Sequence, residues 1–150
     1  MAFRPLPPCM GDDRMTVRVH VSAVEDASLV HQALRSWLGD VDISRDASPS
    51  HHGPTMITLS ADLQRNAELR RGIAGLGEEV CGHLRDEHAS RMDDDGGLHF
   101  RLDLDALLSG AMVLAPPGSS RSVKVRYKVA VYPGQTAQGR ILEVLTNEAL

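Results

Sequence analysis

Apolar and polar residues alternate in four separate stretches of the chain. The stretches are residues 15–22, 55–63, 98–103 and 121–133. A period of two places apolar side chains on one face of a strand and polar side chains on the other, so each stretch predicts a half-buried strand. A shorter strand is expected around Val41, Ile43 and Arg45, and another in the apolar run 110–115.

Between these strands the apolar spacing changes to the helical period. Asp26 is suited to cap a helix whose apolar stripe includes Trp37, and Gly39 stands where the helix should end. From Asn66 onward, apolar residues recur at steps of three and four, and glycines around 75–77 predict two helices joined there. A terminal helix is expected over 137–150.

This order of elements predicts an α+β fold, a two-layer sandwich in which helices cover one face of a largely antiparallel sheet. Residues 15–150 are expected to form a single α+β domain. Residues 1–14 contain Pro, Gly and Asp without any period and are predicted to be a disordered N-terminal lead-in. Residues 47–54, rich in Ser, Pro, His and Gly, predict a loop.

The cysteine content and the length of the apolar runs indicate a cellular location. Only Cys9 and Cys81 are present, no secretory signal opens the chain, and no apolar run reaches the length of a membrane helix. We therefore expect a soluble cytoplasmic protein with free thiols and no membrane partner.

The charge distribution distinguishes one region of the chain from the rest. The formal net charge is −4, which argues against indiscriminate binding of polyanions. Residues 1–97 are net acidic, whereas residues 98–132 hold five cations and two carboxylates, a net charge of +3. Positive charge is thus concentrated in the later strands.

The polar faces of three predicted strands carry the basic residues that the sequence offers as candidate RNA contacts. These candidates are Arg18, His20, His99, Arg101, Lys124, Arg126 and Lys128. Clustered cations of this kind can hold a phosphate backbone. The alternative is a solvated face that keeps the sheet soluble. Because His20 and His99 gain charge in acid, we expect tighter binding below about pH 6.5.

No constellation in the sequence supports catalysis, a cofactor or a metal. His51 and His52 are adjacent and would point apart in an extended chain, which is unsuited to shared metal coordination. Asp103 and Asp105 could form a carboxylate pair or cap the turn that follows them. We therefore expect a protein that is not an enzyme.

Several segments together resemble a family of small archaeal α+β proteins described as predicted RNA-binding proteins or possible exosome subunits. The segments are His51-His52-Gly53-Pro54 with the strand after it, residues 98–103, Gly110 and residues 123–133. The resemblance implies a fold similar to that of the ribosomal protein that carries 5S RNA, and an RNA-related role without known chemistry. The chain departs from the family pattern after Asp103, where a cation and an aromatic residue are missing. This departure shifts the expected RNA contact to the strands, above all Lys124, Arg126 and Lys128.

From the residues and the resemblance, we expect a non-enzymatic RNA-binding protein, accessory to RNA processing or exosome-linked degradation. It would bind the phosphate backbone and belong to an RNA-processing complex. The alternative is a protein-interaction subunit that docks an acidic partner through the sheet face or the sheet edge without touching RNA.

Overall fold

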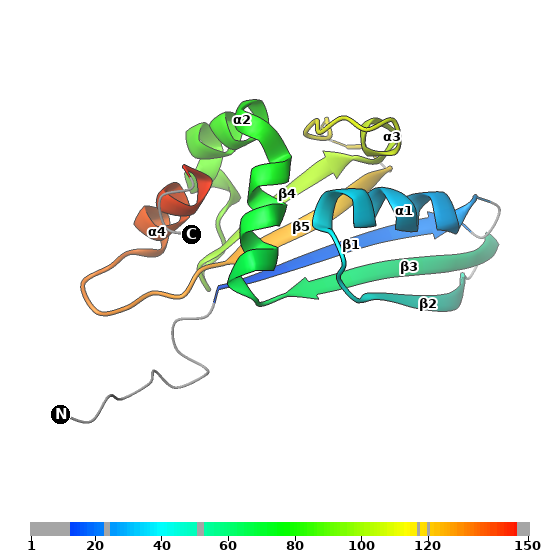
Figure 1. Cartoon of the computed structure of the whole chain (residues 1–150), viewed down its shortest axis with the longest axis horizontal. Helices are drawn as coiled ribbons and strands as arrows, with labels where there is room; N and C mark the ends of the chain where they lie inside the picture. The colour runs from blue at the N-terminus through cyan, green and yellow to red at the C-terminus, as the bar shows by residue number, and fades with distance from the viewer. Residues whose placement is uncertain (1–12, 23–24, 51–52, 117, 120, 147–150) are drawn as a thin grey trace, which may run out of the picture.

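The computed structural model describes residues 13–22, 25–50, 53–116, 118–119 and 121–146. Five strands and four helices are assigned within these ranges (Figure 1). In chain order they are β1 (Arg14–Ser22), α1 (Ala27–Leu38), β2 (Ile43–Ser50), β3 (Gly53–Leu63), α2 (Asn66–Arg91), β4 (Gly97–Asp103), α3 (Leu104–Leu108), β5 (Ser122–Lys128) and α4 (Ala137–Leu145). The protein has the predicted α+β architecture.

The strands form one antiparallel sheet in the order β2-β3-β1-β5-β4. Strand β1 lies at its centre, where Val17 is paired with Ala61 of β3 and with Val125 of β5. Since directly paired residues point to the same face, this register aligns the apolar rows of neighbouring strands. The aligned rows form the floor of the hydrophobic core.

The helices cover the apolar face of the sheet and leave the other face open (Figure 1). Asp26 caps the start of helix α1, where its side chain accepts from the Ser28 amide, and Gly39 with φ +88° caps its end. Trp37 is buried in the core, where its indole N–H donates to the Gly72 carbonyl at 2.8 Å. The predicted caps and the predicted core position of Trp37 are confirmed.

Helix α2 consists of two segments that meet at Gly77. This residue has φ +83° and ψ 162°, a conformation that interrupts the helix and that glycine adopts without steric cost. Leu69, Ile73 and Leu76 are buried before the interruption, and Val80 and Leu84 after it. The expected pair of helices is confirmed, with the junction at Gly77.

Two predicted segments, a loop and a strand, differ from the structure. Strand β2 runs to Ser50 and β3 starts at Gly53, so most of the predicted loop 47–54 is an extended hairpin; His51 and His52 lie outside the described residues. Strand β2 is at the sheet edge, where a proline is tolerated, and its pairing with β3 shifts register between Ser48 and Ser50. In the predicted strand 110–115, only Leu114 forms a bridge, to Leu102.

The fold includes the last two residues of the predicted lead-in. Arg14 opens β1, and the Asp13 side chain is only 5% exposed and forms an ion pair with Arg140 of α4. Their assignment to a disordered segment was wrong because a charged residue next to prolines and glycines gave no sign of a distant partner. Residues 1–12 lie outside the described part of the chain, as do 147–150 at the end of the predicted terminal helix.

Candidate nucleic-acid interface

The seven residues predicted to contact RNA all project from the open face of the sheet. They come from β1, β5 and β4, which are adjacent in the sheet order. The inward residues between them, including Phe100 and Tyr127, are buried. Polar side chains alternate with apolar ones along each strand, and the register aligns the polar positions of neighbouring strands. Cations that are far apart in sequence therefore lie together on one surface.

A row of three cations crosses the sheet where these strands lie side by side. Arg18 on β1 is paired with Lys124 on β5, and Lys124 is paired with Arg101 on β4. Neighbouring strands are about 4.8 Å apart, so the backbone positions of the three residues span roughly 10 Å. All three side chains are exposed, and none has a carboxylate partner among the residues that the structure describes. We call Arg18, Lys124 and Arg101 the cation row.

Asp93, in the turn before β4, binds two of the other predicted contacts. Its Oδ2 accepts from His99 Nε2 at 2.5 Å and from Arg126 Nε at 3.0 Å. Its Oδ1 accepts from the backbone amides of Gly97 and Asp95, both at 2.9 Å. The Gly97 amide, then His99 and Arg126, hold the pKa of Asp93 far below its ordinary value. Arg126 and His99 therefore already have an anionic partner within the protein.

The other two predicted contacts lie beyond the cation row. His20 Nδ1 lies 2.9 Å from Thr58 Oγ1 on β3. Partial burial, together with the charges of Lys124 and Arg18, lowers the pKa of His20. Lys128 is exposed at the end of β5, opposite Arg14, whose guanidinium binds Asp62.

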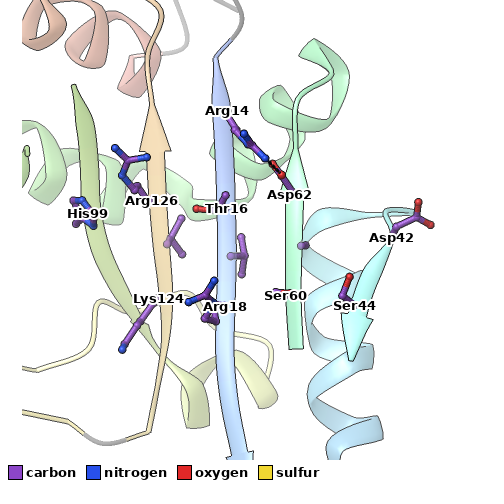
Figure 2. A pocket seen from close by; sticks show the side chains of 13 residues that line it. Arg14, Thr16, Arg18, Asp42, Ser44, Ser60, Asp62, His99, Lys124 and Arg126 are labelled. Carbon is purple, nitrogen blue, oxygen red and sulfur yellow. Dashed lines mark hydrogen bonds and ion pairs between the residues drawn. The ribbon is translucent and has the colours of Figure 1, made fainter. Parts of the chain in front are cut away.

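The open face is hollowed along the cation row. One groove of about 600 Å³ contains Arg18 and Lys124 and is also lined by Arg14, Thr16, Ser44, Ser60 and Asp62 (Figure 2). A second groove of about 650 Å³ shares His99 and Lys124 with the first and continues past Arg101. The second groove reaches Arg91 at the end of α2 and Pro116 in the segment between α3 and β5. The cation row thus lies where the two grooves meet.

Sequence reasoning did not identify Arg91 or the hydroxyl residues of this surface. Arg91 occupies the last position of α2, and only the packing of α2 beside β4 brings it near the sheet. The strand period does place Thr16 and Ser60 on the polar face, but a hydroxyl residue at such a position does not by itself indicate a contact; Ser44 of β2 lies on the same face.

The remaining candidate groups have structural roles or stay untested. Asp103 caps α3 through its bond with the Ala106 amide, and Asp105 pairs with Arg121, so the two carboxylates do not form a joint site. Cys81 is buried, and Cys9 lies outside the described residues.

Within the described ranges, no three His, Cys, Asp or Glu residues lie close enough to hold a metal. No helix in those ranges has the length and apolarity needed to span a bilayer.

The chain was compared with known protein families and with curated proteins. A family model described as RNA binding matches residues 14–129, which include all five strands and the whole cation row. The chain belongs to this RNA-binding family. Among curated proteins, none matches the chain.

Three solved structures with the same fold come from archaea. A DUF54 protein from Methanothermobacter thermautotrophicus is 26% identical, with a TM-score of 0.75 over 90% of this chain and 98% of that one. A DUF54 protein from Archaeoglobus fulgidus is 20% identical, with a TM-score of 0.72 over 91% and 99% of the two chains. A UPF0201 protein from Methanococcus jannaschii is 12% identical, with a TM-score of 0.63 over 91% and 99%. The last two likenesses concern the fold alone.

Proposed function

We propose that this protein binds RNA through the open face of its sheet and has no catalytic activity of its own. The observation that carries the proposal is the cation row of Arg18, Lys124 and Arg101, which lacks internal carboxylate partners within the described residues. Membership of a family described as RNA binding supports RNA as the polyanion.

Backbone phosphates are the groups that this surface suits best. Three exposed cations held on rigid strands can each neutralise a phosphate, and binding gains free energy from the counterions that are released. Base stacking contributes little, because Phe100 and Tyr127 of the basic strands point into the core. Binding is therefore salt-dependent and weakly selective for sequence.

A role as an accessory to RNA processing or exosome-linked degradation is part of the proposal. A bound protein without catalytic groups would act by holding RNA for a separate enzyme. Affinity purification with and without nuclease tests this role: partners that are lost after nuclease are joined through RNA, and partners that stay are bound directly.

The proposal is tested by fluorescence anisotropy with labelled RNA. A triple variant with Arg18→Ala, Lys124→Ala and Arg101→Ala should bind at least about tenfold more weakly, as expected for the loss of several phosphate contacts. The matched control changes Arg35, Arg70 and Arg71 of α1 and α2 to Ala, which alters net charge equally on the helical side.

Equal loss of affinity in both triple variants would show that only net charge matters. No RNA binding by the wild-type protein, together with direct capture of an acidic protein through the same face, would support the protein-docking alternative.

A further inference from the structure

The open face is chemically divided between its cationic half and a half rich in hydroxyl groups. Across one row of the sheet, Ser44 on β2 is paired with Ser60 on β3, and Ser60 is paired with Arg18 on β1. The same row then continues into Lys124 and Arg101. Hydroxyls and cations thus form a single line across all five strands.

Three hydroxyls in this region are available to a ligand. Ser44, Ser60 and Thr16 line the same groove as Arg18 and Lys124, and Figure 2 shows Ser60 and Thr16 beside Arg18. None of the three hydroxyls bonds to another group among the residues described. Thr58 on the same face differs, because its hydroxyl already contacts His20.

The hydroxyl half suits a neutral sugar better than a phosphate. Asp42 lines this side of the groove, is exposed and has no cationic partner within the described ranges. Asp62 also lines it, with Arg14 bound to its carboxylate. An unpaired carboxylate repels phosphate and accepts hydrogen bonds from hydroxyl donors.

Given that RNA binds as proposed above, we infer that Ser60, Ser44 and Thr16 contact ribose 2′-hydroxyls while the cation row holds the phosphates. Ser60 lies one strand spacing, about 4.8 Å, from Arg18, so neighbouring groups of one nucleotide can reach both. A serine or threonine hydroxyl can both donate to and accept from a 2′-hydroxyl. Because the 2′-hydroxyl distinguishes RNA from DNA, these residues determine selectivity for RNA.

The test compares one RNA sequence with its 2′-fluoro analogue, which keeps the RNA sugar pucker and the phosphates but cannot donate from the 2′ position. The wild-type protein should bind RNA about three- to tenfold more tightly than the analogue, as expected for one or two lost hydrogen bonds. Ser60→Ala and the isosteric Thr16→Val should each reduce this ratio. Ser48→Ala, on the same sheet face outside the groove, is the matched control and should keep it.

The outcomes separate this inference from the function on which it rests. Equal binding of RNA and analogue by the wild-type protein would overturn the inference and leave phosphate binding intact. A ratio that is unchanged in both Ser60→Ala and Thr16→Val would overturn the assignment to these hydroxyls. Failure to bind either oligonucleotide would overturn the proposed function itself. Circular dichroism of each variant checks its folding, and Ser44→Ala replaces any variant that unfolds.

Discussion

The Tyr127 hydroxyl donates a hydrogen bond of 2.9 Å to the buried carboxylate of Asp13. Asp13 also accepts from the Ala130 amide at 2.9 Å and from Arg140 Nη2 at 3.0 Å. These bonds join the residue before β1 to β5 and to α4. The bonds lie on the helical side of the sheet, so they stabilise the fold without involving the cation row.

Replacing Tyr127 by Phe should lower the free energy of unfolding by about 1–3 kcal/mol, because buried Asp13 loses a donor that water cannot replace. Urea denaturation followed by circular dichroism measures the change. RNA affinity of the folded variant should equal that of the wild type, and a loss of affinity would place this network in the binding site.

The same hydroxyl should give the protein an alkaline stability limit. Burial, with the charge of Asp13 next in importance, raises the pKa of Tyr127 well above its ordinary value of 10.0. A phenol whose folded pKa is raised contributes stability that is complete below the unfolded pKa, near 10, and declines as pH rises above it. Stability measured from pH 8 to pH 11 should therefore fall more steeply in the wild type than in Tyr127→Phe.

Two glycines of α2 should respond oppositely to alanine. A Cβ at Gly75 would lie 2.7 Å from Trp37 Cδ1, whereas at Gly82 the nearest group is the flexible end of Arg85 at 3.6 Å. Gly75→Ala should destabilise the protein by about 1–3 kcal/mol through overpacking. Gly82→Ala should stabilise it by up to about 1 kcal/mol through helix propensity. Thermal unfolding of both variants is the measurement, and a stabilised Gly75→Ala would contradict the contact with Trp37.

Replacing Asp93 by Asn should strengthen RNA binding. Asn keeps the Oδ1 acceptor for the Gly97 and Asp95 amides but removes the negative charge held against Arg126 and His99. Affinity should rise by about two- to fivefold, the range expected for releasing a partly exposed ion pair. Asp94→Asn is the control, because Asp94 is exposed in the same turn and has no described partner. An equal gain in both variants would mean that net charge alone is responsible.

RNA binding should also tighten as the pH falls. The change should occur below pH 6.5, which is the ordinary pKa of histidine. The pKa of His20 is lowered, so its positive charge appears only below pH 6.5, and phosphate then favours the protonated ring. Affinity measured from pH 7.5 to pH 5 should rise toward the acid end in the wild type. The rise should be smaller in His20→Gln, and an identical profile in the two proteins would exclude His20 as its source.

The basic face could be predicted from the sequence because alternation determines which side chains share a strand face. The order of the strands could not, since the pairing of β1 with both β3 and β5 depends on contacts between distant segments. The neutralisation of Arg126 is a similar case, because Asp93 lies 33 residues earlier in a turn whose composition indicates only a break. The extension of β2 and β3 into residues 47–54 was missed because Ser, Pro and Gly are typical of loops, although an edge strand such as β2 tolerates them.

The most direct test of RNA binding by the cation row is the salt dependence of affinity. Binding of a labelled single-stranded RNA would be measured from 50 to 200 mM salt for the wild type and for the triple variant at Arg18, Lys124 and Arg101. Each lost phosphate contact reduces the slope of log affinity against log salt by about 0.7, so the slope should become shallower by about 2. An unchanged slope in a folded variant would contradict the proposal that these three residues hold the RNA backbone.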